Sequence, residues 1–515
     1  MLHESSVKKI FASTWLCGVM LILNSSASAQ KPNILVILAD DLGYGDVSCY
    51  NSESKVKTPH IDQLAKTGLR FTDAHSPSTV CTPTRYSLLT GRMAFRTGMR
   101  GVFTGVGGPC MIEPKRVTLA SMLKQKGYAT ACIGKWHVGM TFFDKEGKPI
   151  NKNGLEAVKQ VDYSRRSPDS PIHRGFDHFF GTVCCPTTDW LYAYMDGDII
   201  PKPPTRILDK TPLPKHAYSR DNRGGLIADD FDLEKVDLMF LEKSKQFLID
   251  HAAKETRKPF FLLHSTQAVH LPSFPADQFK GKTGFGPHGD FIHELDFIVG
   301  ELMDTLKKLD MVENTLVIFT SDNGPETASV VNMRKDHQHD GARPWRGVKR
   351  DNWEGGHRVP FIARWPKVIA ANQETDQTFC LTDVMATCAS IVGYKLNNRM
   401  AEDSFDFFPV LKDPGLKKPV REFTIHQTIS LALAIRSGKW KYLDHKGSGG
   451  NRYDRGRMKK FALPEGEPDS PGQLYDLEQD PGETTNLYSR YPDVVQRLRR
   501  QLNQFKDIGA SAPIR

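Results

Sequence analysis

The sequence predicts an α/β protein with a large mixed, mostly parallel sheet flanked by helices, followed by a small C-terminal antiparallel sheet with a helix. Three observations support this prediction. Continuous apolar runs of strand length alternate with amphipathic helical segments. Polar side chains follow the ends of those runs, and the pattern changes to short alternating strands after about residue 415.

The first residues differ from the rest of the chain. Lys8 and Lys9 precede an apolar run from Ile10 to Leu23, and Ala27-Ser28-Ala29 has the small residues of a signal-peptidase site. A membrane anchor is the alternative, but the run is short for a span and the small residues favour cleavage. We therefore expect a signal peptide at 1–29 and a periplasmic or secreted protein without a membrane span after cleavage.

Buried strands and helices alternate as far as about residue 415. Strands are predicted at Ile34–Leu38, around Ala129–Ile133, from Phe260 and at Thr315–Thr320, because continuous apolar runs suit a sheet covered on both faces. An amphipathic helix precedes the second of these strands, and a long helix with apolar residues at 3–4 spacing precedes the fourth. These elements predict a main domain at 30–415.

The C-terminal region has shorter elements. The stretch FTIHQTISLALAIRSGKWKYL predicts alternating strands with a turn at Ser437-Gly438, and PDVVQRLRRQLNQFKDI predicts a closing amphipathic helix. We expect a C-terminal subdomain at 416–515. Residues 199–225 are rich in Pro, Lys and Arg, which predicts a long loop.

Composition excludes little, but it limits the partners. The net charge of +9, from 69 basic and 60 acidic residues, suits an anionic substrate and is also typical of ordinary solubility. The basic residues form no single run and no nucleic-acid-binding module, so no nucleic-acid partner is expected. Removing the signal takes away Cys17 and leaves eight cysteines without the spacing of a metal knuckle. Some can pair in an oxidising compartment, but the sequence gives no connectivity.

Two acidic pairs follow predicted strands. Asp40 and Asp41 come after the first strand, and Asp322 and Asn323 after the fourth. Ligands of open α/β sheets bind at the carboxyl ends of the strands, where these pairs would lie. Their oxygen atoms suit Ca²⁺ or Mg²⁺ better than zinc. Unrelated turns are the alternative for each pair alone, and the shared placement favours a site.

Several cationic side chains occupy comparable positions. Together they could surround a tetrahedral anion and supply a proton to a leaving oxygen. Each alone has a structural explanation, as a solvated lysine or a hydrogen-bonded histidine, and periodicity does not show that they converge. These residues are Arg85, Lys135, His137, His270 and Lys349.

The stretch CTPTRYSLLTGR, residues 81–92, contains a candidate nucleophile. Pro83 suits the first turn of a helix, which places Cys81 at or just before its N-cap, where the helix terminus stabilises an anion. Arg85 would share that helical face. The residues alone leave open whether Cys81 is a nucleophile or a small buried cysteine beside a turn.

These motifs together resemble the type I, formylglycine-dependent sulfatases of the alkaline-phosphatase-like superfamily. CTPTRYSLLTGR resembles the family signature, whose cysteine is oxidised after translation to Cα-formylglycine. The resemblance extends from about Pro32 to Leu487, and it implies the superfamily's α/β fold. Further motifs match in the same order: PNILVILADDLGYGD, GKWHVG, RGFDHFFG, SDNG, WEGGHRVPFIARWP and LYDLEQDPGETTNL.

The resemblance implies one calcium ion, with the modified side chain of Cys81 completing its site. The other implied ligands are Asp40, Asp41, Asp322 and Asn323.

It also implies a role for each cationic residue. Arg85 and Lys135 would hold the hydrated aldehyde and the sulfate, and His137 would assist turnover of the covalent intermediate. His270 and Lys349 would bind sulfate and protonate the leaving oxygen. An aldehyde hydrate has a second hydroxyl that can expel sulfate, whereas a thiol would form a stable sulfur-linked ester.

The implied function is that of a sulfuric ester hydrolase acting on a sulfated polysaccharide or glycosaminoglycan, with aryl sulfates as possible surrogates. Its maturation partner would be a formylglycine-generating enzyme. The alternatives are a phosphonate monoester or phosphodiester hydrolase of the same superfamily and a non-catalytic glycan-binding homologue.

Some positions depart from the family pattern. Thr82 stands where Ser or Pro is commoner. The segment RDN, which follows Lys349, and His357 also depart from the pattern, and both could lie near the mouth of the pocket. The charged tract after SDNG offers possible substrate contacts, with surface solvation as the alternative. The residues concerned are His337, His339 and Asp340.

Overall fold

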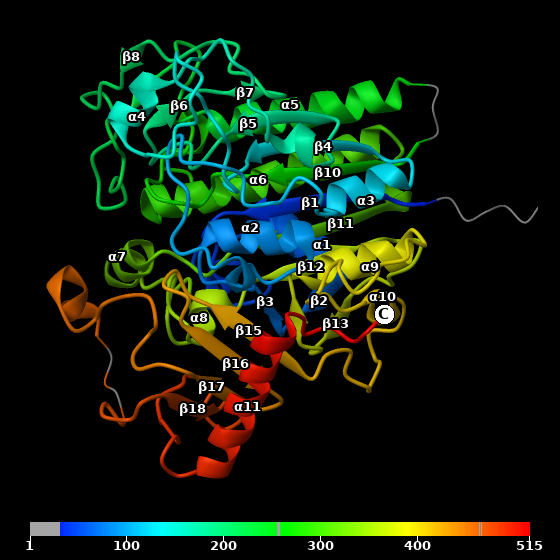
Figure 1. Cartoon of the computed structure of the whole chain (residues 1–515), viewed down its shortest axis with the longest axis vertical. Helices are drawn as coiled ribbons and strands as arrows, with labels where there is room; N and C mark the ends of the chain where they lie inside the picture. Colours follow the sequence, from blue (N-terminus) through cyan, green and yellow to red (C-terminus); the bar gives the residue numbers. More distant parts are fainter. Residues whose placement is uncertain (1–30, 255–257, 463, 465) are drawn as a thin grey trace, which may run out of the picture. The chain divides into compact units, whose positions relative to one another are not determined.

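A nine-stranded sheet is the largest element of the computed structural model, which describes residues 31–254, 258–462, 464 and 466–515. Its strand order is β13-β2-β12-β11-β1-β10-β4-β5-β7 (Figure 1). The strands are β1 Asn33–Ala39, β2 Leu69–Phe71, β4 Ala129–Lys135, β5 His178–Thr182, β7 Met195–Asp196, β10 Phe260–Ser265, β11 Thr315–Ser321, β12 Phe361–Arg364 and β13 Gln373–Thr375.

The middle of this sheet is parallel. β1 pairs in parallel with β10 and β11, β10 with β4, and β4 with β5, whereas β12 and β7 run antiparallel to their neighbours. Every residue of β10 and β11 is buried, as are six of the seven in β1. Burying each large apolar side chain contributes roughly 1.5–3 kcal/mol, which explains why these continuous apolar runs form the centre of the sheet. The predicted mixed, mostly parallel sheet is confirmed.

Helices cover both faces of the sheet because its crossovers run in two directions. The chain runs from β2 to β4 in one direction along the sheet, and it later moves in the opposite direction from β5 to β10 and from β10 across β1 to β11. Right-handed crossovers therefore place α3 on one face and α5 and α6 on the other. The helices are α1 Pro59–Lys66, α2 Cys81–Thr90, α3 Leu119–Gln125, α4 Leu155–Gln160, α5 Val236–Ala252, α6 Gly286–Lys308, α7 Thr327–His337, α8 Glu354–His357, α9 Asp383–Ile391, α10 Phe408–Lys412 and α11 Pro492–Ile508.

A four-stranded antiparallel sheet follows, in the order β15-β16-β17-β18. Its hairpin turns at Gly438, as predicted, and α11 packs against β16 and β17 (Figure 1). The small C-terminal antiparallel sheet with a helix is thus confirmed, while the boundary at residue 415 stays a prediction. The strands are β15 Phe423–Gln427, β16 Leu433–Ser437, β17 Trp440–Leu443 and β18 Gln473–Asp476.

Two small sheets complete the fold. One pairs β3 (Ala74–His75) with β14 (Phe379–Cys380). The other has the order β6-β9-β8, formed by Leu191–Tyr192, Leu226–Ile227 and Arg206–Ile207. The predicted long loop at 199–225 is therefore interrupted by one short strand, β8.

The predicted signal peptide lies outside the described residues. Among the residues that are described, no helix combines the length and apolarity needed to cross a bilayer. The eight cysteines from Cys49 to Cys388 are all unpaired.

Candidate functional site

The ends of four adjacent strands bring the predicted polar residues to one edge of the sheet. Asp40 and Asp41 follow β1, Asp322 and Asn323 follow β11, and Lys135 is the last residue of β4. Because β10 and β11 flank β1, and β4 lies beside β10, these side chains converge. The sequence correctly predicted this shared placement.

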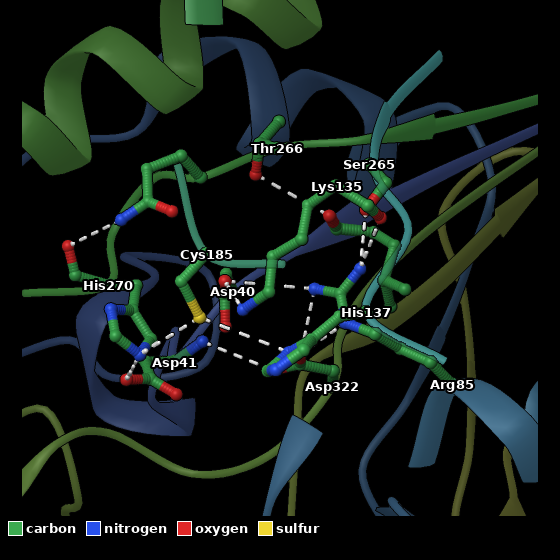
Figure 2. Close-up of polar contacts among 12 residues, drawn as sticks. Asp40, Asp41, Arg85, Lys135, His137, Cys185, Ser265, Thr266, His270 and Asp322 are labelled. Carbon is green, nitrogen blue, oxygen red and sulfur yellow. Dashed lines mark hydrogen bonds and ion pairs between the residues drawn. The ribbon is translucent and has the colours of Figure 1, made fainter. Parts of the chain in front are cut away.

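The floor of the site is a buried network of charges (Figure 2). Lys135 Nζ donates to Asp40 Oδ2. Arg85 contacts Asp322 Oδ2 through Nε at 2.9 Å and Nη2 at 2.7 Å. Its Nη1 donates to Ser265 Oγ at 2.5 Å and to the Lys135 carbonyl at 3.0 Å. Arg85 therefore joins α2 to the ends of three strands.

A glycine permits the close approach of two of these strands. Gly134 has a φ of +116°, and a Cβ at this position would lie 1.8 Å from the carbonyl oxygen of Ser265. Only glycine tolerates that contact. Gly134 therefore allows the two strands to approach closely just before Lys135, whose side chain enters the site.

The Asp41 carboxylate is the centre of a second group of polar side chains. Lys349 Nζ lies 2.7 Å from its Oδ1 and 2.8 Å from its Oδ2, and Asn323 Nδ2 donates to Oδ1 at 2.7 Å. His270 Nε2 lies 3.7 Å from Oδ2. Asp41 has a φ of 60°, a left-handed conformation that costs a non-glycine residue about 1–3 kcal/mol and is typical of functional sites.

The charges in the floor set the protonation of its members. Burial opposes ionisation of Asp40, but its cationic neighbours, led by Lys135, outweigh burial and hold its pKa well below the usual range. Burial and the Asp40 carboxylate together raise the pKa of Asp322 to about 8, despite Arg85. Burial also opposes the charge on Lys135, yet Asp40 raises the pKa of this lysine well above its ordinary value.

The oxygen-rich set fits a hard cation. In the described part of the chain, Asp40 Oδ1 and Asn323 Oδ1 are buried and have no hydrogen-bond partner. Ligand atoms of Asp40, Cys81 and Asp322 lie within 4.8 Å of one another. Buried oxygens without partners are costly, and a cation coordinated by oxygens such as Ca²⁺ or Mg²⁺ would satisfy them.

Above this floor is a pocket of about 210 Å³. Cys81, His137, His270 and Lys349 are among its lining residues. Cys81 is the first residue of α2, one position after the N-cap Val80, close to the position that the sequence predicts. The pocket thus unites the candidate nucleophile with three of the predicted cationic residues.

His137 and Cys185 form one side of the pocket. His137, with a φ of 57°, hydrogen-bonds through Nε2 to the Phe103 carbonyl at 2.7 Å. Cys185 Sγ lies 3.9 Å from both His137 Nδ1 and His270 Nε2. A hydrogen bond with the Cys81 thiol lowers the pKa of Cys185 to about 7, against the effect of burial. Sequence reasoning missed Cys185, although it follows β5 just as the other site residues follow their strands.

The pocket lining contains further residues that no motif indicated. Arg350 makes a bidentate ion pair with Glu326, at 2.9 and 2.7 Å. Asp189 accepts hydrogen bonds from the backbone of Gly105 and Trp190. Asp221 and Arg223 also line the pocket.

Two expectations about loop residues are wrong. His339 is buried and pairs with Asp46 at 2.8 Å, so it neither lines the pocket nor faces solvent. His357 is fully buried and does not line the pocket, whereas Arg350, directly after Lys349, is a lining residue. His337 and Asp340 are not among the pocket-lining residues, and Asp340 pairs with Arg334.

His357 belongs to a buried histidine cluster, defined as His75, His357 and His426. His75 Nδ1 lies 3.0 Å from His357 Nδ1, and His75 Nε2 lies 2.9 Å from Asp73. The rings of His357 and His426 stack at 3.7 Å and 10°. In-plane lone pairs of stacked rings do not converge, so this cluster is not arranged to share one metal ion. It connects β3, α8 and β15 instead.

Comparison with known proteins identifies the family. The family model described as Sulfatase matches residues 32–394, well over half of the chain. The chain belongs to the sulfatase family. It is a type I sulfatase with an alkaline-phosphatase-like fold, and hence a sulfuric ester hydrolase.

Individual sulfatases match almost the whole chain. The N-acetylgalactosamine-6-O-sulfatase of Bacteroides thetaiotaomicron is 32% identical over 519 residues, covering 95% of this chain and 96% of its own. Human arylsulfatase A is 33% identical, with 92% and 87% covered. A solved structure from work on glycosaminoglycan metabolism by B. thetaiotaomicron has a TM-score of 0.77 at 31% identity, covering 93% and 100%. A sulfatase structure from Pseudoalteromonas sp. has a TM-score of 0.69 at 28% identity, covering 94% and 92%.

Proposed function

We propose that this sulfatase is exported to the periplasm or secreted, and that it removes sulfate from a polysaccharide or glycosaminoglycan through a Cα-formylglycine made from Cys81. The observation that carries the proposal is the position of Cys81, which begins α2 in the pocket beside His270 and Lys349. The similarity to an N-acetylgalactosamine-6-O-sulfatase over nearly the full length of both chains supports a sulfated sugar as substrate. A formylglycine-generating enzyme would be the maturation partner.

Calcium is the proposed metal. Asp40, Asp41, Asp322 and Asn323 would hold it with the modified side chain of Cys81, because this set supplies oxygen ligands and two of them, Asp40 Oδ1 and Asn323 Oδ1, are buried without a partner. When bound, the ion would neutralise charge on the sulfuryl oxygens.

The side chains around the nucleophile have separable roles in the proposal. Formylglycine hydrate would supply the attacking oxygen. Arg85 and Lys135 stay cationic because the neighbouring carboxylates raise their pKa values against the effect of burial, so they orient the anionic reacting group. His137 Nδ1 lies beside Cys185 in the pocket and would accept the proton of the second hydroxyl when the covalent intermediate breaks down.

The leaving oxygen would receive its proton from His270 or Lys349. His270 Nε2 and Lys349 Nζ both lie near Asp41, at 3.7 and 2.7 Å, so the same carboxylate positions the two donors. General acid catalysis of this kind typically contributes about 10²–10⁴-fold to a rate.

The test is sulfate release, measured by ion chromatography, from N-acetylgalactosamine 6-sulfate and chondroitin sulfate oligosaccharides. A matched pair of 4-nitrophenyl sulfate and a 4-nitrophenyl phosphonate monoester is assayed beside them. We expect sugar desulfation that is lost in Cys81→Ala and kept in the matched control Cys184→Ala. Faster phosphonate hydrolysis would favour the phosphorus-directed alternative, and glycan binding without sulfate release would favour a non-catalytic homologue.

A further inference from the structure

One wall of the pocket is formed where two segments of the chain meet. The Lys349 backbone N–H donates to the Pro325 carbonyl at 2.8 Å, which brings the residues after each of them, Arg350 and Glu326, close together. Glu326, Lys349 and Arg350 all line the pocket that contains Cys81. The Glu326–Arg350 ion pair therefore belongs to the same wall as Lys349.

The backbone of Arg350 is held in a conformation that is unfavourable for an arginine. Its φ is 79°, in the left-handed region that favours glycine. The Arg350 N–H donates to the Thr79 carbonyl at 2.9 Å, and a Cβ on Gly450 would lie 1.9 Å from the Arg350 carbonyl oxygen. The segment also departs from the family pattern at this residue. A strained backbone that carries a large charged side chain into a pocket is typical of a functional residue.

The ion pair is only partly shielded from solvent. Arg350 Nη1 lies 2.9 Å from Glu326 Oε1, and Nη2 lies 2.7 Å from Oε2. The two side chains are 31% and 12% exposed, so a ligand in the pocket can reach them. The segment has other anchors, because Lys349 is bonded through its N–H to Pro325 and through its carbonyl to Asn451 Nδ2 at 2.9 Å.

The pair keeps hydrogen-bonding capacity at adjacent atoms. Each terminal nitrogen of a guanidinium has two N–H groups, and each carboxylate oxygen has two lone pairs. The described contacts of Arg350 Nη2 and Glu326 Oε2 use one of each. A donor and an acceptor 2.7 Å apart can serve two hydroxyl groups on neighbouring carbons of a sugar ring.

We propose that the Glu326–Arg350 pair recognises two neighbouring hydroxyl groups of the sugar that carries the sulfate. Arg350 Nη2 donates to the oxygen of one hydroxyl, and the other hydroxyl donates to Glu326 Oε2. The pair thus selects a sulfated sugar with a vicinal diol over a sulfate ester without ring hydroxyls. The inference rests on the proposed function for the class of substrate, and it adds the residues that select the sugar.

The test measures binding to the full chain carrying Cys81→Ala, so that no turnover occurs, with calcium present. Calorimetry compares N-acetylgalactosamine 6-sulfate with cyclohexylmethyl sulfate. Both are sulfate esters of a primary alcohol on a six-membered ring, but only the sugar has ring hydroxyls.

Two variants and one control are made in this background. Arg350→Gly suits the left-handed backbone, and Glu326→Gln keeps the shape of the side chain and removes its charge. Asn372→Gly is the matched control, because Asn372 is exposed, has a φ of 56° and is not among the pocket-lining residues.

We expect both variants to weaken binding of the sugar sulfate about 10–100-fold, the loss typical of a hydrogen bond to a charged group. Cyclohexylmethyl sulfate should lose much less, so the preference for the sugar should fall at least about 10-fold, and the control should keep it. The proposal is overturned if the chain with Cys81→Ala alone binds the two ligands equally. It is also overturned if Arg350→Gly and Glu326→Gln weaken both ligands by the same factor, as a merely structural or charge effect would, or weaken neither. Preference for the sugar without sulfate release from sugars by the converted enzyme would contradict the proposed function and leave the inference intact.

Discussion

Arg85 and Asp322 lie 237 residues apart and form a buried two-nitrogen contact, with Nε–Oδ2 of 2.9 Å and Nη2–Oδ2 of 2.7 Å. Arg85 is four residues after Cys81 on α2, and Asp322 follows β11 directly. The pair therefore fixes the start of the Cys81 helix against the carboxylates at the edge of the sheet.

Replacing Arg85 should show how much its guanidinium group contributes to stability and activity. Arg85→Lys keeps the charge but loses charge-assisted hydrogen bonds worth about 1.5–3 kcal/mol each, so we expect a loss of about 3 kcal/mol in unfolding free energy. Activity should fall at least about 100-fold. Urea unfolding measures the first effect, with the exposed Arg165→Lys as the matched control. Equal stability of the two variants would contradict the structural role.

Calcium should stabilise the fold by binding the oxygen cluster. At a calcium concentration of about 100 Kd, the expected gain is about 2.7 kcal/mol, seen as a higher Tm than in chelator-treated protein. Asn323→Ala should remove most of that shift, whereas Asp340→Asn, outside the cluster, should keep it. A chelated protein with an unchanged Tm and no calcium binding by calorimetry would exclude the site.

The contribution of His270 to the rate should increase with the basicity of the leaving group. In His270→Ala, kcat/KM for a sugar sulfate should fall about 10²–10⁴-fold, because an alkoxide leaves poorly without a proton. For 4-nitrophenyl sulfate the loss should be smaller, since nitrophenolate leaves unaided. His137→Ala is the control: because its role comes after departure, it should lower kcat for both substrates alike and leave the ratio of their kcat/KM values unchanged. Equal losses in His270→Ala would remove it as the general acid.

The histidine cluster predicts a loss of stability in acid. Burial holds the pKa values of His75, His357 and His426 below the ordinary 6.5, so unfolded chains bind more protons as the pH falls. The charged groups facing them are Asp73, Glu354, Lys441, Glu483, Arg358 and Arg436.

The contribution of this cluster to stability should therefore be complete above about pH 6.5 and decline below it, and the difference in urea midpoint between wild type and a cluster variant would show this across pH. Buried His264 and His288, with pKa values lowered by burial to about 3 and about 4, extend the decline over the same range. His426→Phe should keep the stacking and make the decline shallower, whereas the exposed His178→Phe should not. A difference in midpoint between wild type and His426→Phe that stays constant from pH 7 to 4 would contradict this assignment.

The sequence predicted the parts of this molecule that depend on local pattern. Continuous apolar runs predicted β1, β10 and β11, and the residues that directly follow such strands predicted most of the pocket floor. Cys185 and the Glu326–Arg350 pair were missed because no spacing distinguishes them before the loops fold. His339 was misread for a related reason, since its partner Asp46 lies 293 residues away.

The central claim is that Cys81 is converted to formylglycine. Peptide mass spectrometry across residues 81–92 of protein co-expressed with a formylglycine-generating enzyme tests it most directly. The account predicts a peptide in which an aldehyde replaces the CH₂–SH group of Cys81, in the same preparation that releases sulfate. A fully active preparation whose Cys81 remains a thiol would contradict it.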